Sequence, residues 1–127
     1  MTIRTVLGIL VPACLLGACS SGPESAIPGK AAERPAAFAQ CAICHSVEPG
    51  RNGIGPSLAG VYGAQAGHVA DYAYSTAMRE SGLTWDEATL DSYLQNPRAA
   101  VPNTKMSYAG LRDDAQRAEL IAWLKAL

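Results

Sequence analysis

The stretch Cys41-Ala42-Ile43-Cys44-His45 decides how this chain of 127 residues folds. Two thiols separated by two residues, with an imidazole directly after the second, form the attachment pattern for c-type haem. In that pattern each thiol adds to one vinyl group of the porphyrin, and the imidazole reaches the iron from one side. The motif therefore predicts one covalent haem c held by Cys41 and Cys44, with His45 as an iron ligand.

Other uses of a cysteine pair fit the chain less well. A thioredoxin-like redox pair needs a βαβ context, and the chain shows no strand alternation. A zinc site needs further ligands, but only Cys14, Cys19 and His68 remain, and two of these fall in the N-terminal leader. A disulfide across two residues is strained. Haem attachment is therefore the favoured interpretation, and it takes place outside the cytosol.

The composition is that of one small domain with little charge. The formal net charge is −1 and 17% of the residues are charged, which excludes a disordered charged tail and an electrostatic nucleic-acid binder. Aromatic residues make up only 6% of the chain, so the side chains alone form a thin core. We therefore expect a group other than protein to help fill the interior.

The N-terminal residues have the pattern of an export signal. Arg4 precedes an apolar run from Val6 to Leu16 that is too short to span a bilayer, so residues 1–18 are interpreted as a signal peptide. Leu16-Gly17-Ala18-Cys19 resembles the lipobox of bacterial lipoproteins, which implies acylation of Cys19 and a lipid anchor in the membrane. An ordinary cleavage site, with Cys19 free or discarded, is the alternative. Residues 19–34 then form a flexible tether, and residues 35–127 form the domain.

Helix patterns occupy four places in the domain. We expect short helices over 35–44 and 75–81. The stretch Thr84-Trp85-Asp86-Glu87 has the capping-box pattern with Thr84 as N-cap, and Asn96-Pro97 stops the helix that follows. Asp113 caps the last helix. The apolar faces of the last two helices consist of Leu90, Tyr93, Leu94, Leu120, Ile121, Leu124 and Leu127.

The remaining segments are expected to be loops. Residues Ser46 to Gly67 are rich in glycine and contain two prolines, which disfavours helix and strand. Loops of this length are unusual in a compact helical domain unless they enclose something that is not protein. The sequence therefore predicts an all-α fold in which three to five helices wrap around one covalently attached haem.

The second axial ligand of the iron separates two kinds of function. An open position can bind or activate a small molecule, whereas a protein sulfur that closes it leaves electron transfer. The candidates are Met78, Met106 and His68. Met78 lies in a helix pattern where methionine usually fills a core, and His68 follows a glycine in a surface loop. Met106 ends an irregular stretch shaped by Pro102, so we expect it to be the ligand.

The chain resembles the class I cytochrome c family, close to its mitochondrial and bacterial c2-like members, over residues 36–127. After the haem-attachment motif, the stretches that carry the resemblance follow in family order: Gly55-Pro56-Ser57-Leu58-Ala59-Gly60, Tyr74-Ser75, Gly82-Leu83-Thr84-Trp85, Tyr93-Leu94-Gln95-Asn96-Pro97, Pro102-Asn103-Thr104-Lys105-Met106 and Leu120-Ile121-Ala122-Trp123-Leu124.

The resemblance implies a role for each matching residue. Cys41 and Cys44 form the thioethers, His45 is the proximal iron ligand and Met106 the distal one. Pro56 offers its carbonyl to the far ring nitrogen of His45. The other implied roles are a hydrogen bond near the Met106 sulfur from Tyr93, donors to the haem propionates from Tyr74, Trp85 and Thr104, a helix crossing at Phe38 and Trp123, and a lining of the haem faces by Leu58, Leu94 and Leu124.

Two positions in the loops and the first helix depart from the family pattern. Family members have a small glycine one turn before Phe38, whereas Arg34-Pro35 stands there in this chain, so we expect a shorter first helix. Ala64 replaces a loop arginine that assists one propionate.

Mitochondrial-type members of the family carry a ring of basic side chains around the exposed haem edge, and in this chain that ring is incomplete. Around the haem edge the chain keeps Arg98, Lys105 and Arg112, while four other ring positions hold Gln40, Ala99, Asp113 and Asp114. We therefore expect weak electrostatic steering toward partners.

The resemblance implies an electron carrier rather than an enzyme. Its expected partners are membrane redox enzymes, namely a quinol–cytochrome c reductase and a terminal oxidase or reductase, with no small-molecule substrate. A monomer, exported and lipid-anchored to a bacterial membrane facing the periplasm, completes the expectation. The alternatives are a haem enzyme or ligand sensor whose sixth iron site opens, and a fixed electron-input subunit of an oxidase complex.

Overall fold

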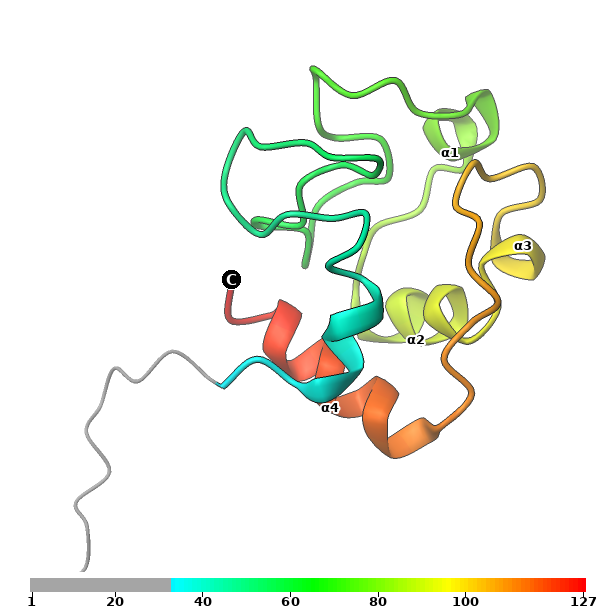
Figure 1. The fold of residues 1–127 in the computed structure, drawn as a ribbon. Coiled ribbons are helices and arrows are strands. Elements are labelled where there is room, and N and C mark those ends of the chain that lie inside the picture. Colours follow the sequence, from blue (N-terminus) through cyan, green and yellow to red (C-terminus); the bar gives the residue numbers. More distant parts are fainter. Residues whose placement is uncertain (1–32) are drawn as a thin grey trace, which may run out of the picture.

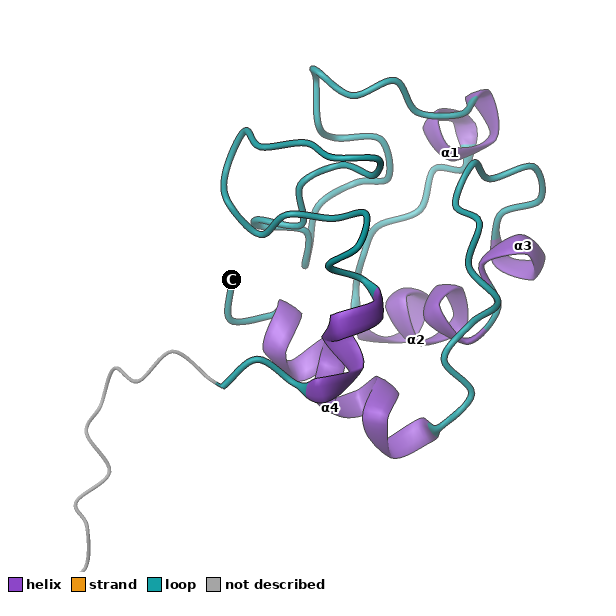
Figure 2. Cartoon of the chain, in the orientation of Figure 1, coloured by secondary structure: helices purple, strands orange, loops and turns teal. Residues whose placement is uncertain are grey.

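Helices joined by long loops build the domain. The computed structural model describes residues 33–127. In this range a short 3₁₀ helix, η1 (Ala36–Gln40), is followed by α1 (Thr76–Glu80), α2 (Glu87–Gln95), α3 (Pro97–Ala100) and α4 (Asp114–Leu124) (Figure 1). Loops connect η1 to α1 and α3 to α4 (Figure 2). These residues contain no named strand, only an isolated bridge between Gln65 and Thr84, so the all-α prediction is confirmed.

The N-terminal predictions fall largely outside this range. The signal peptide over 1–18, the acylated Cys19 and most of the tether over 19–34 lie outside the described residues. None of the helices that residues 33–127 form has the length and apolar character needed to cross a bilayer.

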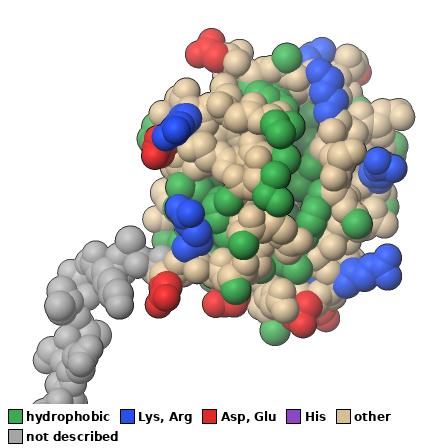
Figure 3. Space-filling view, in the orientation of Figure 1, with side chains coloured by type: hydrophobic (Ala, Val, Ile, Leu, Met, Phe, Trp, Pro, Cys, Tyr) green, Lys and Arg blue, Asp and Glu red, His purple; other side chains and the backbone are tan. Residues whose placement is uncertain are grey.

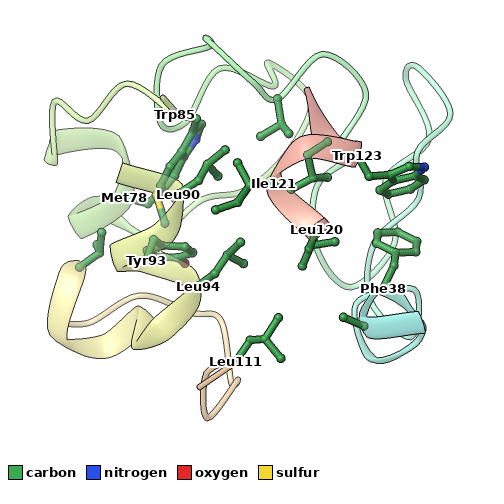
Figure 4. Packing of buried hydrophobic residues seen from close by; sticks show 14 residues of the cluster. Phe38, Met78, Trp85, Leu90, Tyr93, Leu94, Leu111, Leu120, Ile121 and Trp123 are labelled. Atoms are coloured by element: carbon green, nitrogen blue, oxygen red, sulfur yellow. The ribbon is translucent and has the colours of Figure 1, made fainter. Parts of the chain in front are cut away.

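The first and last elements of the domain pack against each other. The rings of Phe38 in η1 and Trp123 in α4 lie 4.6 Å apart between centroids, tilted by 53° (Figure 4). The Arg34 guanidinium lies 5.2 Å from the centroid of the Phe38 ring and 5.9 Å from that of Trp123, within the range of a cation–π contact. Arg34, in the area where the family has a small glycine, therefore adds a cation to this crossing.

The prediction of a short helix over 35–44 is wrong in its length. Pro35 is extended, and its carbonyl accepts from the Phe38 N–H at 2.9 Å, which begins a 3₁₀ helix instead of an α-helix. The helix ends at Gln40, and Cys41 to Cys44 form turns. The first helix therefore spans only five residues; that Arg34-Pro35 shortens it relative to the family stays a prediction.

Helix α2 begins two residues later than its capping box predicts. Thr84 pairs with Gln65 in the isolated bridge, and Trp85 N–H donates to the Ala64 carbonyl at 2.8 Å. This pairing keeps the backbone extended through Trp85. Asp86 is therefore the N-cap, and its side chain accepts from the Thr89 N–H at 2.8 Å. The prediction of Thr84 as N-cap is wrong because Thr84 pairs with Gln65, a residue distant in sequence.

The C-terminal half follows the sequence pattern more closely. Asn96 ends α2 as expected, but its side chain also caps α3, a short helix that the sequence analysis missed. Asp113 caps α4 through the Gln116 N–H at 2.9 Å, as predicted. Leu127 lies beyond the end of α4 and is 40% exposed, so its placement in the apolar face is wrong.

The buried side chains form one cluster around the interior of the domain. Phe38 and Trp123 lie at one side of this cluster, and Met78, Trp85, Leu90 and Tyr93 gather at the other (Figure 4). Helices α2 and α4 contact each other. The helices and loops thus hold the two parts of the cluster on either side of the site described next.

Candidate haem site

A largely apolar cavity of about 270 Å³ lies between the helices and loops of the domain. Hydrophobic side chains gather along a hollow in the middle of the face shown in Figure 3, whereas charged side chains lie around its margin. Every site residue predicted from the sequence within the described range lines the cavity: Cys41, Cys44, His45, Pro56, Tyr74, Trp85, Tyr93, Thr104 and Met106. The structure also brings Leu58, Leu94 and Leu124 to it.

The two thiols lie half-buried at the cavity wall, in the turn that follows η1. They form no disulfide with each other. Burial, and secondarily the Cys44 thiol, raise the pKa of Cys41 above its ordinary value. Both sulfurs remain available for covalent attachment.

The orientation of His45 is set from two sides. Its Nδ1 lies 2.7 Å from the Pro56 carbonyl oxygen, and since a carbonyl only accepts, Nδ1 carries the proton. The lone pair therefore sits on Nε2, the nitrogen left for a metal. Gly55 lies against the imidazole: a Cβ there would collide with the ring, at 2.7 Å from Nδ1. Only a glycine allows this close approach.

Met106 is held by a closed ring of three hydrogen bonds. The Tyr93 hydroxyl donates to the Met106 sulfur at 3.4 Å, because a thioether can only accept. The Thr104 hydroxyl must then donate to the Tyr93 oxygen, 3.0 Å away. Thr104 in turn accepts from the Met106 N–H at 3.3 Å. Each donor has one proton and each is used once, so the ring fixes the direction of every bond.

Burial keeps the Tyr93 hydroxyl protonated. It raises the pKa of Tyr93 above its ordinary value of 10.0, although the Thr104 hydrogen bond acts in the opposite direction. The donor to the Met106 sulfur therefore persists through neutral and mildly alkaline pH.

The loop that carries Met106 is also tied to the opposite loop. Lys105 Nζ donates to the Ala73 carbonyl at 2.9 Å. Asn103, just before Thr104, has a φ of 68°, the left-handed conformation that asparagine adopts more readily than most residues. Thr104 and Met106 themselves contact α2 through the Tyr93 hydroxyl.

Three predicted propionate donors lie at the cavity. Trp85 is buried and Tyr74 is half-buried, and burial raises the pKa of Tyr74 above its ordinary value. The Thr104 hydroxyl is engaged with Tyr93, as described above. The propionate role of all three stays a prediction.

The other candidates for the second axial ligand behave as expected. Met78 is buried and belongs to the core, and it also lines the cavity. His68 is exposed at the rim, with Nδ1 3.1 Å from the Gln65 carbonyl oxygen. Neither is held next to Tyr93 by hydrogen bonds as Met106 is.

Some contributing residues were not foreseen. The close packing of Gly55 on His45 was missed, although its place directly before Pro56 is a signal of it. Ser57 is buried and ties the loop after His45 together: its hydroxyl donates to the Glu48 carbonyl at 2.7 Å, and its N–H donates to Asn52 Oδ1 at 2.9 Å. No periodic pattern in the sequence marks such a loop contact.

The residues at the cavity fit a haem c. Cys41 and Cys44 offer two thiols for thioether bonds, and His45 offers a free Nε2. Met106 offers a soft sulfur, and the lining is largely apolar, as a porphyrin requires. When bound, the group supplies an iron couple that gains and loses one electron.

Comparison with known proteins agrees with this donor set. The family model described as Cytochrome c matches residues 31–127. Cytochrome c2 iso-2 of Magnetospirillum fulvum is 53% identical over 96 residues, which cover 76% of this chain and 100% of that protein. Cytochrome c2 of Rhodomicrobium vannielii is 53% identical over 88 residues, covering 68% of this chain and 70% of that protein.

A solved structure is similar as well. Cytochrome cH from Methylobacterium extorquens has a TM-score of 0.69 and 49% sequence identity, and the match covers 76% of this chain and 98% of that one. The motif at residues 41–45, the cavity that it faces and these matches lead to one assignment. The chain belongs to the cytochrome c family, with Cys41 and Cys44 as attachment points for one covalent haem c.

Proposed function

We propose that this electron carrier moves single electrons outside the cytosol, between a respiratory donor and a terminal oxidase or reductase. The observation that carries the proposal is the ring of hydrogen bonds that holds the Met106 sulfur at the same cavity as the free Nε2 of His45. With imidazole and thioether as the two axial ligands, no iron position is left for a substrate. The chain then acts as a carrier and not as an enzyme.

The environment of the site supports a high reduction potential. Its lining is mostly apolar, and an apolar surrounding favours the less charged, reduced form of a buried centre. Thioether ligation acts in the same direction. A quinol–cytochrome c reductase is the proposed donor.

The optical spectrum of the purified holoprotein tests the carrier proposal. We expect the oxidised protein to show a weak sulfur–iron band at the red end, and Met106→Ala to abolish it. Met78→Leu is the matched control, because it removes another thioether at the same cavity, and it should keep the band. Stoichiometric carbon monoxide binding by the reduced wild-type protein would instead favour an open iron site.

We also propose that the carrier is anchored to the membrane through acylated Cys19 and faces the periplasm. The lipobox-like stretch Leu16 to Cys19 supports an anchor, and several acyl chains hold a protein durably at a bilayer. The low charge of the domain gives a reason for such an anchor, because it leaves little electrostatic attraction to a partner. A tether raises the local concentration of the carrier at a membrane enzyme without electrostatic attraction.

Turnover with a membrane oxidase tests the anchor. We expect the full-length chain to react much faster at low protein concentration than a soluble variant in which a cleavable export signal without a lipobox replaces residues 1–33, and its rate to depend only mildly on salt. Cys19→Ala, with the rest of the chain intact, should partition into the aqueous phase. Equal rates for the anchored and soluble forms would contradict the proposal.

A further inference from the structure

Arg117 is the only charged residue in the described part of the chain that is buried. It lies in the first half of α4 and is 3% exposed. Burying a guanidinium costs free energy unless its N–H groups are hydrogen-bonded and its charge is paired. The contacts of Arg117 therefore indicate its role in the fold.

The guanidinium of Arg117 connects three parts of the fold. Nε and Nη2 donate to the two carboxylate oxygens of Asp91 in α2, at 2.6 and 3.4 Å. Nη2 also donates to Asp114 at 2.8 Å. Nη1 donates to the backbone carbonyl of Leu111 at 2.8 Å. The two carboxylates raise the pKa of Arg117, which stays charged at every accessible pH.

Leu111 lies near the downstream end of the segment that carries Met106. In this Met106 segment, residues 101–112, the Leu111 N–H donates to the Leu94 carbonyl of α2 at 2.8 Å. Arg117 holds the carbonyl of the same residue from α4. Gly110 lies so close to the end of α2 that a Cβ would overlap the Gln95 carbonyl oxygen. The downstream end of the segment is thus clamped between two helices.

The upstream end is fixed separately. Val101 is 2% exposed, and its N–H donates to the Pro97 carbonyl of α3 at 2.9 Å. Met106 lies midway between the two fixed ends. Together with the Lys105 contact to Ala73, the two fixed ends therefore keep its sulfur in place, and the ring with Tyr93 and Thr104 tolerates little displacement.

We propose that Arg117 is a positioning residue for Met106: it clamps the downstream end of the Met106 segment to α2 and α4 and so keeps the thioether at the iron. This inference rests on the proposed function, in which Met106 is an axial ligand. The clamp needs an arginine, because the planar fork meets the Asp91 carboxylate and the Leu111 carbonyl at once. A lysine ammonium on a single stem makes the same set of contacts less well.

Added imidazole reports how readily Met106 leaves its position in the oxidised holoprotein. We expect Arg117→Gln to bind imidazole about tenfold to a hundredfold more tightly than the wild type, the range that losing a hydrogen bond to a charged group gives. Arg117→Lys should fall between them. The control Arg112→Gln removes the same charge at the exposed residue next to Leu111, and it should stay within about twofold of the wild type, since most exposed substitutions have small effects.

A second readout separates positioning from plain stability. The far-UV circular dichroism midpoint in denaturant reports global unfolding. If Arg117→Gln lowers that midpoint while imidazole affinity stays at the wild-type value, Arg117 is only structural and the inference is overturned. If Arg117→Gln does not fold, Asp91→Asn serves instead, because it weakens the clamp and leaves the Leu111 contact. It should tighten imidazole binding by about threefold to tenfold, and an unchanged affinity overturns the inference.

The proposed function fails in a different way. If Met106→Ala leaves the red-end band and the imidazole affinity as in the wild type, Met106 is not a ligand, whatever the Arg117 variants do.

Discussion

Tyr93 is the residue that we expect to tune the electron affinity of the proposed site. Its hydroxyl donates to the Met106 sulfur and receives a bond from Thr104. With Met106 as the proposed axial ligand, a donor on its sulfur draws electron density away from the iron, which favours the reduced form. The hydroxyl keeps this role because its pKa lies above 10.0. Its contribution to stability is complete below pH 10.0 and is lost as the pH rises through the higher pKa of the folded state.

Tyr93→Phe should lower the reduction potential by about 20–60 mV. A neutral hydrogen bond contributes about 0.5–1.5 kcal/mol, and a tenfold change in a one-electron equilibrium corresponds to about 59 mV. Spectroelectrochemical titration of the holoprotein measures the shift. Tyr108→Phe, which removes a hydroxyl from the same cavity without touching the ring around Met106, is the control. A potential that falls equally in both variants would show that the sulfur contact has no part in it.

At the scale of secondary structure, a capping side chain stands at the start of each described α-helix, but not of η1. Asp86 and Asp113 both accept a backbone N–H three residues ahead, and both lie at exposed positions. The Thr89 backbone and side-chain hydrogen bonds lower the pKa of Asp86 below its ordinary value of 3.8. The Asp86 carboxylate therefore stabilises the fold fully above pH 3.8, and this contribution disappears as the pH falls through the lower pKa of the folded state.

Asp86→Ala should lower the melting temperature at pH 7 but have a much smaller effect in acid. The cap is lost in the variant at every pH, whereas in the wild type it weakens only once the carboxylate is protonated. Thermal unfolding of both proteins at pH 7 and near pH 2 gives the comparison. A difference in melting temperature that is the same at both pH values would mean that the charge of Asp86 does not contribute.

Local pattern predicted the helices whose signals lie within one stretch of chain. The face of Leu90, Tyr93 and Leu94 and the cap at Asp113 follow from spacing alone, and both are present. The predicted start of α2 was wrong because Thr84 pairs with Gln65, which is distant in sequence. The short 3₁₀ form of η1 was not foreseen either; it begins with the hydrogen bond from the Phe38 N–H to the Pro35 carbonyl.

The same limit applies to the site. The spacing of Cys41, Cys44 and His45 identifies the attachment motif, and the structure brings all three residues to one cavity. The packing of Gly55 on the His45 ring is a matter of three-dimensional approach. The bonds from Arg117 to Asp91 span 26 positions, and sequence spacing has no rule that links such distant residues.

For the whole molecule, the haem is part of the core. Without the group, the apolar side chains that line this cavity would lose the contacts that it supplies and would face water instead. A small domain has a total stability of about 5–15 kcal/mol. Losing the group therefore removes a large part of the free energy of folding.

The double variant Cys41→Ser/Cys44→Ser should lose cooperative unfolding and most of its helical far-UV signal at room temperature. It cannot attach haem covalently. The side chains around the cavity then lack the haem that they would all contact. Cys19→Ser, which leaves the attachment motif intact, should keep both the absorbance and the cooperative transition. A colourless double variant that still melts cooperatively would show that the protein core is sufficient on its own.

The contact between Phe38 and Trp123 joins the two ends of the domain. A chain made from its N-terminus onward cannot complete this crossing until nearly the last residue has emerged, long after the cysteine pair. Until α4 packs on η1, Phe38 and the turn that carries Cys41 and Cys44 lack this partner. The last helix of the chain is thus the element that closes the domain over its attachment motif.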